Sequence, residues 1–454
     1  MRFVIALVAL ACGPSPQPTT PGPAPGTPTG ATGTPSGPTA STASTADTGM
    51  PPVVSDCPDV ATYAWSAPQA VREADLLWAY GGAAGLDAQG RGWFLAHEDV
   101  GATGIISLTR LDPDGNWSEP IALHSNNLSA TGWSPRVAVN AAGDGLATFR
   151  EDANSGGDLF AVTLAADGTS GPKIRVGPDD ASFSIEPSID DAGLRIGLYN
   201  DDDNGTTQVF STDGTATGNG VAFSDPLGTG VISWNREPGG PGMLFAVVTG
   251  GDFQVVGVPW DPVGGFGTPE PVVANPSGLI GGAWLGEGRA VFVYGVFPGP
   301  GQRVQVWLTE RLPEGSWSAP VRIDTGDGSA HASARPPIAG APGEAIVRWD
   351  QPDGEKIARF VGGSGLSDEE TFARGSLYDV AADRCGNAVV LQRGGGNNAL
   401  TAVHYRAATG WQPPVDVQPD TTTAPQWADV TLTADGEGLV VFEYSSRYRF
   451  STFR

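Results

Sequence analysis

The sequence has few of the side chains on which most metal and nucleophilic sites depend. Its 454 residues include three cysteines, three methionines and four histidines. The histidines, at 97, 124, 331 and 404, do not have the His-x-x-x-His spacing of a zinc-binding helix. The chain also has no Gly-x-Ser-x-Gly elbow, no phosphate-binding glycine loop and no paired-cysteine metal motif. It therefore lacks the common local motifs of an enzyme active site, and no cofactor is evident.

Basic residues are also scarce. Lysine occurs only at positions 173 and 356, which points to a GC-rich genome rather than to function. Fifty acidic residues against 25 basic ones give a formal net charge of −25. Such a surface repels phosphate backbones and anionic head groups, so we expect no nucleic-acid partner. Cationic ligands or divalent metals such as calcium are better tolerated, although solubility explains the acidity equally well.

No apolar run is long enough to cross a bilayer. Residues 1–12 place one arginine and a short apolar stretch before Cys12, whereas a membrane helix needs about 20 apolar residues. This order predicts a signal peptide over residues 1–11. The segment Ala9-Leu10-Ala11-Cys12 resembles the lipobox of bacterial lipoproteins, with alanine at the first position in place of the commoner leucine.

The resemblance implies that Cys12 becomes the lipidated first residue of the mature protein. Gly13, rather than aspartate, follows the cysteine. In lipoproteins of this kind that implies attachment to the outer membrane, with the domain facing the periplasm or the cell surface.

Residues 13–56 are almost entirely Pro, Gly, Ser, Thr and Ala. Such a segment cannot bury enough apolar surface to offset its ordering entropy, so we predict a lipidated, disordered tether over residues 12–56. As a flexible coil it would span about 35 to 40 Å. Only the lipid is expected to contact the membrane.

Residues 57–454 contain a repeated turn phrase, in which a glycine is followed two positions later by Gly or Ala and then by an apolar strand. Clear copies centre on Gly90, Gly143, Gly386 and Gly436, and weaker ones on Gly193, Gly228, Gly286 and Gly343. Because Gly, Asn and Asp accept positive φ readily, each copy predicts a tight hairpin. A second phrase, an aromatic residue with proline three positions later, begins at Trp65, Trp117, Phe266, Trp317 and Trp411.

A period of about 50 residues with four antiparallel strands per repeat is typical of a β-propeller. Eight copies predict eight blades. Gly193 and Gly228 are closer together than the other copies, so seven blades is the alternative, and a two-sheet sandwich is a further one. The segment Asp112–Trp117 partly resembles the aspartate box of sialidase-type propellers, with Arg110 where the box has serine and Asp114 where it has glycine.

The two ends of the repeat region are complementary. The last repeat lacks an outer strand, whereas Trp65–Val71 is an outer strand without a blade. We therefore predict that this N-terminal strand completes the C-terminal blade and closes the propeller. That closure brings Cys57 and Cys385 to one face, which predicts a disulfide in an exported protein. Two unpaired thiols are the alternative.

Acidic and arginine residues recur where the chain leaves the second strand of a repeat, a position that would surround one mouth of a propeller's channel. The acidic members are Glu98, Asp99, Glu151, Asp152, Asp202, Asp203, Glu237 and Asp350. They could bind a divalent cation or a polar ligand, or they could simply be exposed loop residues. For a sialidase-like enzyme, the anion clamp would be Arg150, Arg236, Arg348 and Arg393, with Tyr444 as nucleophile and Glu443 as its base.

We therefore expect a monomeric, lipid-anchored protein of the cell envelope that presents a propeller to an unknown protein or glycan ligand without catalysis. The alternatives are a glycan-active, sialidase-like hydrolase and a structural divalent-cation-binding surface protein.

Overall fold

In the computed structural model, the chain divides into the units Met1–Gly49 and Met50–Arg454, and every described residue belongs to the second. The predicted signal peptide, Cys12 and the tether lie outside the described residues. The structure describes residues 57–71, 78–100, 103–126, 135–151, 158–176, 181–189, 195–201, 206–212, 222–223, 230–237, 240–248, 254–262, 265–276, 278–299, 304–324, 334–351, 353–373, 375–394, 398–419, 423–444 and 447–454.

The fold is all-β, as predicted. Apart from one 3-10 turn, η1 (Val60–Thr62), the regular elements of the described residues are strands, which form six four-stranded and two five-stranded antiparallel sheets. We number the sheets 1 to 8 in chain order. None of the described residues forms a helix long and apolar enough to cross a membrane.

Sheets 1 to 4 occupy the first half of the chain. Sheet 1 contains β2 (Trp78–Leu86), β3 (Gly92–Val100), β4 (Thr103–Leu111) and β5 (Ile121–Asn126). Sheet 2 contains β6 (Arg136–Val139), β7 (Gly145–Glu151), β8 (Asp158–Leu164) and β9 (Ile174–Val176). Sheet 3 contains β10 (Ala181–Ile189), β11 (Arg195–Asp201), β12 (Thr206–Thr212) and β13 (Ala222–Phe223). Sheet 4 contains β14 (Gly230–Arg236), β15 (Gly242–Val248), β16 (Gln254–Asp261), β17 (Gly265–Phe266) and β18 (Glu270–Ala274).

Sheets 5 to 8 follow. Sheet 5 contains β19 (Gly278–Gly286), β20 (Arg289–Val296), β21 (Gln305–Arg311) and β22 (Val321–Arg322). Sheet 6 contains β23 (Ala334–Ala339), β24 (Glu344–Gln351), β25 (Gly354–Val361) and β26 (Gly365–Phe372). Sheet 7 contains β27 (Leu377–Ala382), β28 (Ala388–Arg393), β29 (Leu400–Arg406), β30 (Gly410–Trp411) and β31 (Val415–Gln418). Sheet 8 contains β32 (Ala428–Leu432), β33 (Gly438–Tyr444), β34 (Arg447–Phe453) and β1 (Gln69–Ala70).

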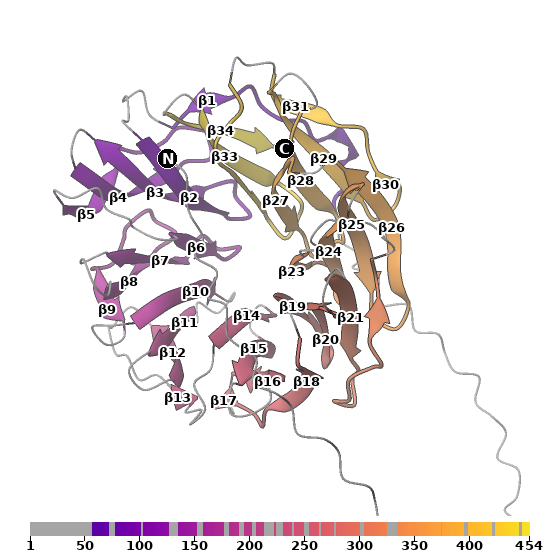
Figure 1. Ribbon diagram of the computed structural model, residues 1–454. Helices are drawn as coiled ribbons and strands as arrows, with labels where there is room; N and C mark the ends of the chain where they lie inside the picture. The colour runs from indigo at the N-terminus through magenta and orange to yellow at the C-terminus, as the bar shows by residue number, and fades with distance from the viewer. Residues whose placement is uncertain are drawn as a thin grey trace, which may run out of the picture. The chain divides into compact units, whose positions relative to one another are not determined.

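The first strand of each sheet contacts the first strand of the next, from β2 through β6, β10, β14, β19, β23 and β27 to β32, and β32 in turn contacts β2 (Figure 1). The sheets pack face to face, because one sheet cannot cover both of its own apolar faces. Phe149 and Val162 of sheet 2, for example, are fully buried against Leu95 and Leu108 of sheet 1. Burying each such side chain stabilises the fold by about 1.5 to 3 kcal/mol.

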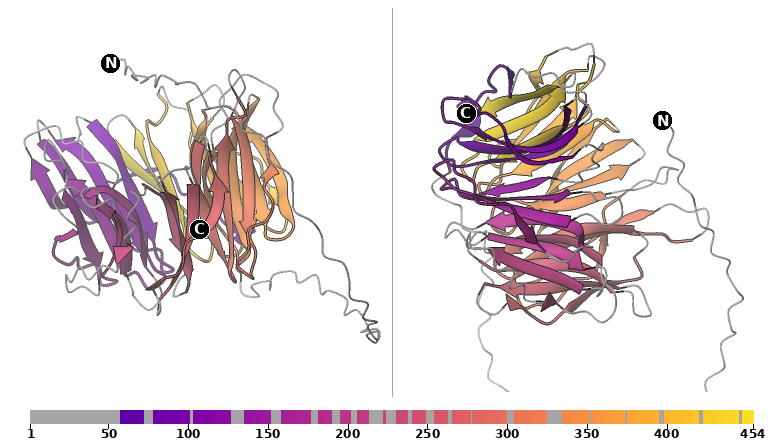
Figure 2. Two further views of the ribbon diagram at one scale, coloured as in Figure 1. Left: turned by 60° about the horizontal axis from the view of Figure 1, so that its bottom comes forward. Right: turned by 90° about the vertical axis from the view of Figure 1, so that its left-hand side faces the viewer.

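Sheet 8 joins the two ends of the described chain. The N-terminal strand β1 lies beside the C-terminal strand β34, with Gln69 opposite Phe450 (Figures 1 and 2). The pairing extends on both sides of β1, because the Ser66 N–H donates to the Thr452 carbonyl at 2.8 Å and the Val71 N–H to the Tyr448 carbonyl at 2.9 Å. The segment Trp65–Val71 therefore supplies the outer edge of this sheet.

The repeated turn phrase forms the first turn of a sheet. In sheet 1, Asp87 Oδ1 accepts the backbone N–H groups of Gln89 at 2.9 Å and Arg91 at 2.8 Å, and Gly90 supplies a φ of 73°. The prediction was wrong for sheet 4. Its first turn spans Glu237–Pro241, after β14, whereas the predicted centre Gly228 precedes β14 and lies outside the described residues. The corrected turn removes the uneven spacing that had suggested seven repeats.

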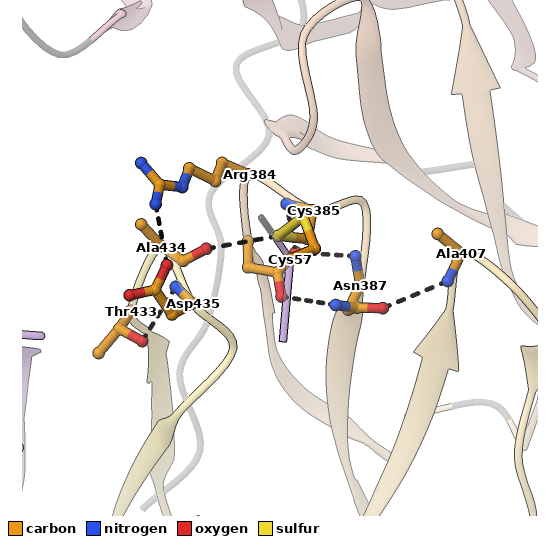
Figure 3. Close-up of a disulfide and its surroundings, with 9 residues drawn as sticks. Cys57, Arg384, Cys385, Asn387, Ala407, Thr433, Ala434 and Asp435 are labelled. Carbon is orange, nitrogen blue, oxygen red and sulfur yellow. Dashed lines mark hydrogen bonds and ion pairs between the residues drawn. A yellow bond between two sulfur atoms is a disulfide. The ribbon is translucent and has the colours of Figure 1, made fainter. Parts of the chain in front are cut away.

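The predicted disulfide between Cys57 and Cys385 is present (Figure 3). Cys385 lies in the first turn of sheet 7, where its N–H donates to Asp383 Oδ1 at 2.8 Å. Beside it, Arg384 Nη2 forms an ion pair with Asp435 Oδ1 of the first turn of sheet 8 at 2.9 Å. The disulfide thus attaches the start of the described chain to sheet 7, next to the sheet that β1 completes.

Candidate functional site

The first strand of each sheet is an edge strand, and its outward backbone groups need partners. Side chains of β14, the first strand of sheet 4, bind the backbone groups of β19, the first strand of sheet 5. Ser233 Oγ accepts the Gly282 N–H at 2.8 Å and donates to the Gly282 carbonyl at 3.1 Å. Asn235 similarly accepts the Trp284 N–H at 2.5 Å and donates to the Trp284 carbonyl at 3.2 Å.

Two aspartates make the same kind of contact in sheets 7 and 8. Asp379 Oδ2 accepts the Val430 N–H at 2.9 Å, and Asp429 Oδ2 accepts the Ala84 N–H at 3.1 Å. The two aspartates are equivalent to Ser233 in their own sheets. Each lies at the same distance before the last paired residue of the first strand. Since a neutral hydroxyl meets the structural need at Ser233, the edge contact alone does not require a carboxyl group.

The two carboxyl groups also lie close enough to influence each other's ionisation. Burial raises the pKa of Asp379, and it raises the pKa of Asp429 well above its ordinary value, with the charge of Asp379 adding to the rise. Protein atoms surround both groups closely, yet both residues retain some accessible surface. Burial therefore favours the protonated form of each carboxyl group, and a charge on one disfavours a charge on the other.

Arginines lie near both members of the pair, which we call the carboxyl pair. The charge of Arg348 favours ionisation of Asp379 and that of Arg136 favours ionisation of Asp429, so each works against the rise in pKa caused by burial. Arg348 is itself buried, with its Nη2 3.0 Å from Glu355 Oε1. The other oxygen of Glu355 accepts the N–H of Leu377 at 3.2 Å.

Of the acidic residues predicted for a channel mouth, the three whose side chains are described occupy different places. Glu98 is buried and accepts a hydrogen bond from Ser107 Oγ at 2.9 Å, inside sheet 1. Glu237 lies in a first turn, where it accepts the Trp284 indole N–H at 3.3 Å, whereas Asp350 lies near a second turn. First and second turns are at opposite ends of the strands.

The remaining members of that set are Asp152, Asp202 and Asp203, which lie outside the described residues, and Asp99 and Glu151, whose side chains do so. No group of three or more His, Cys, Asp or Glu residues within the described ranges is arranged to hold a metal ion. Calcium binding stays a prediction.

One arginine of the proposed anion clamp, Arg236, lies at the other end of the strands from Arg150, Arg348 and Arg393. Arg348 pairs with Glu355, and Arg393 donates to Asn398 Oδ1. Arg236 is the last residue of β14, beside the first turn of sheet 4. Its Nε donates to Ser188 Oγ at 2.8 Å. Arg150 is partly exposed on β7.

The proposed nucleophile and base are engaged in other contacts. Glu443 is buried and one of its oxygens accepts the Gln426 N–H at 3.2 Å. The guanidinium of Arg449 lies 5.9 Å from the ring centre of Tyr444. The sialidase-like site stays a prediction, with Arg236 placed away from its other proposed arginines.

No protein-family model and no curated protein matches this sequence. Solved structures similar to the chain include β-propellers. The propeller domain of the Trilobed protease from Pyrococcus furiosus is 9% identical, with a TM-score of 0.47, and the match covers 71% of this chain and 95% of that domain. The Dos1 propeller is 6% identical, with a TM-score of 0.48, covering 88% of this chain and 96% of that one. These likenesses concern the fold alone and are consistent with the predicted propeller.

Enzymes are among the similar structures, and they correct the expected function. A puromycin hydrolase is 14% identical, with a TM-score of 0.47, and the match covers 82% of this chain but only 59% of the hydrolase. A puromycin-hydrolysing peptidase and dihydro-heme d1 dehydrogenase are also similar. The expectation of a non-enzymatic binding protein was therefore wrong, because it took an all-β repeat without local motifs as a sign that catalysis is absent.

Proposed function

We propose that this chain is an exported hydrolase whose acid–base site is the carboxyl pair, Asp379 and Asp429. One observation carries the proposal. Two carboxyl groups whose pKa is raised by burial lie on adjacent first strands, in positions where Ser233 makes the same structural contact with a neutral side chain. Perturbed, mutually coupled acids that retain access to solvent are typical of catalytic groups.

Such a pair can catalyse attack of water on a carbonyl group. The ionised carboxylate takes a proton from water as the water oxygen bonds to the carbonyl carbon, and the protonated carboxyl gives its proton to the leaving nitrogen or oxygen. One proton is taken and one is given, so transfer of a proton from one carboxyl group to the other restores the starting state. The site would therefore cleave amides or esters.

We further propose that the eight sheets are the blades of one propeller, closed by β1. The first strands contact one another in chain order and β32 contacts β2, which supports a ring. The bond from the Ala84 N–H to Asp429 links the last sheet to the first in the same way that the bond from the Val430 N–H to Asp379 links sheets 7 and 8. Deleting residues 57–71 should then lower the Tm sharply, whereas an unchanged Tm would refute closure by this segment.

Delivery to the outer membrane by lipidation of Cys12 is part of the proposal. The lipobox-like order of residues 9–12 supports it. A Cys12→Ser variant should lose incorporation of labelled fatty acid and leave the membrane fraction. Retention of both properties would refute the anchor.

Activity is tested with the full mature chain on a panel of chromogenic amides and esters. Asp379→Asn and Asp429→Asn should each reduce kcat by about 100-fold or more, because the loss of one proton-transfer group has this effect. Ser233→Ala is the matched control, since it removes the equivalent edge contact without touching the carboxyl pair. It should lower the Tm and leave kcat unchanged. Full turnover in both asparagine variants, or turnover of no panel member by the wild type, would overturn the proposal.

A further inference from the structure

The proposed reaction needs a hydrogen-bond donor as well as two carboxyl groups. When water attacks a carbonyl carbon, the carbonyl oxygen becomes negative, and a neighbouring ionised carboxylate repels that charge. A donor placed at this oxygen offsets the repulsion, because its hydrogen bond strengthens as the charge develops. Such a donor must lie on the side of the strands to which the carboxyl pair points.

Trp427 lies on the same side of its strand as Asp429. The Glu443 N–H donates to the Trp427 carbonyl at 2.9 Å, so the pairing of β32 with β33 continues to this residue. Side chains two positions apart in a strand point the same way and leave the backbone about 6.6 Å apart. Both reach β2 of sheet 1, where Asp429 accepts the Ala84 N–H at 3.1 Å and Trp427 lies against Gly81. The indole and the carboxyl group are therefore neighbours that face the same strand.

Packing fixes the orientation of the Trp427 ring. The ring stacks on Phe94, with ring centres 6.3 Å apart, and meets Tyr448 edge-on at 6.2 Å. Its nitrogen edge faces Gly81, where a Cβ atom would lie 3.5 Å from the indole nitrogen. Gly81 has a φ of 112°, which favours glycine. Because this position has no side chain, the nitrogen edge of the ring stays uncovered there.

The indole N–H of Trp427 is an unused donor. It makes no hydrogen bond within the parts of the chain that the structure describes. The indole nitrogens of Trp117, Trp234 and Trp317 also lack a partner, but they are buried. Trp427 is half-buried, and its nitrogen retains contact with solvent. A substrate can therefore reach this N–H, and binding it breaks no existing hydrogen bond within the protein.

We infer that Trp427 is a further catalytic residue, whose indole N–H binds the carbonyl oxygen of the amide or ester and holds it as it becomes negative. The inference rests on the proposed function for its substrate. A hydrogen bond to that oxygen, the carbonyl bond and the approach of water to the carbon together span about 7 Å, which matches the spacing of the two side chains. The oxygen regains its double bond when the bond to the leaving nitrogen or oxygen breaks and the protonated carboxyl gives up its proton.

Kinetics of the full mature chain on chromogenic amides and esters test this role. Trp427→Phe keeps an aromatic ring but removes the N–H, so kcat should fall by about 100- to 1000-fold with KM unchanged. Trp117→Phe is the matched control, because Trp117 also packs on Phe94, with ring centres 6.2 Å apart, and loses a buried indole N–H. Its kcat should be unchanged. Full turnover in Trp427→Phe, or equal losses in both variants, would refute the catalytic role and leave the proposed function intact. No turnover by the wild type would instead overturn the proposed function and, with it, this role.

Nuclear magnetic resonance tests the free N–H without turnover. In protein with isotope-labelled tryptophan, the indole signal that is missing from Trp427→Phe should be broadened by a soluble paramagnetic probe. The signal that is missing from Trp117→Phe should not be broadened, because that nitrogen is buried. Protection of the Trp427 signal from the probe would overturn the inference, since a covered N–H cannot bind a substrate.

Discussion

His404 should make the stability of the protein sensitive to acid. Its Nε2 accepts the indole N–H of Trp65 at 3.1 Å, and its ring lies 4.4 Å from that of Phe453, centre to centre. It is 7% exposed, on β29 of sheet 7, so it joins the N-terminal segment to two sheets. The contact requires a neutral imidazole, because a protonated Nε2 cannot accept a hydrogen bond.

The magnitude follows from the pKa of His404. Burial, and next the charge of Arg406, lower this pKa from 6.5 to about 4. The unfolded chain then takes up the proton first as the pH falls. The stabilisation is therefore fully present above pH 6.5 and is lost between pH 6.5 and about 4. A difference of about 2.5 units corresponds to about 3 kcal/mol of unfolding free energy.

Urea unfolding at pH 7.5 and pH 4 measures this loss in the wild type and in His404→Gln. The glutamine oxygen can accept the same bond from Trp65 but does not titrate. The buried carboxyl groups with a raised pKa, such as Asp379 and Asp429, act in the opposite direction and are common to both proteins. The wild type should therefore lose about 3 kcal/mol more than the variant between the two pH values. Equal losses would refute the neutral, buried state of His404.

Three further predictions concern stability. Cys57→Ser with Cys385→Ser should cost about 2 to 4 kcal/mol of unfolding free energy, and a reductant should shift the urea midpoint of the wild type but not of the variant. Asp87→Ala should lower the unfolding free energy by about 1 to 3 kcal/mol, measured by calorimetry, because two backbone N–H groups lose their buried acceptor. An unchanged unfolding free energy would refute the structural role of the turn phrase. Gly82→Ala should lower the Tm by several degrees, since the added methyl would lie 2.7 Å from the backbone oxygen of Leu95. An unchanged Tm would contradict that close packing.

Much of the architecture could be predicted from turn chemistry. Asp87, Asn140 and Asp383 each bind backbone N–H groups within their own turn, so the repeat phrase was visible without any tertiary contact. The pairing of Trp65–Val71 with the last sheet and the disulfide followed from counting strands. The error at sheet 4 arose because the turn after β14 has a different phrase, Glu-Pro-Gly-Gly-Pro, and a glycine before the strand was taken for it.

The carboxyl pair could not be recognised as a site from composition, because a single acidic residue in a strand looks like ordinary alternation. The signal was an Asp-Val dipeptide at the same distance before the turn phrases at Asp383 and Thr433, in adjacent repeats. Its meaning depends on the packing of β27 against β32, which places the two carboxyl groups near each other and partly shields them from bulk water. Two members of the predicted acidic set were misplaced for a related reason. Position along the repeat did not show that Glu98 points into a sheet or that Glu237 lies at the other end of the strands.

The most direct test of the central proposal is a difference proton titration of the wild type against Asp379→Asn with Asp429→Asn. If the carboxyl pair holds one proton at neutral pH, the wild type should release one more proton than the double variant as the pH is raised from neutrality until the pair is fully ionised. Identical titration curves over that interval would mean that both aspartates are already ionised at neutral pH, and the acid–base site would not exist.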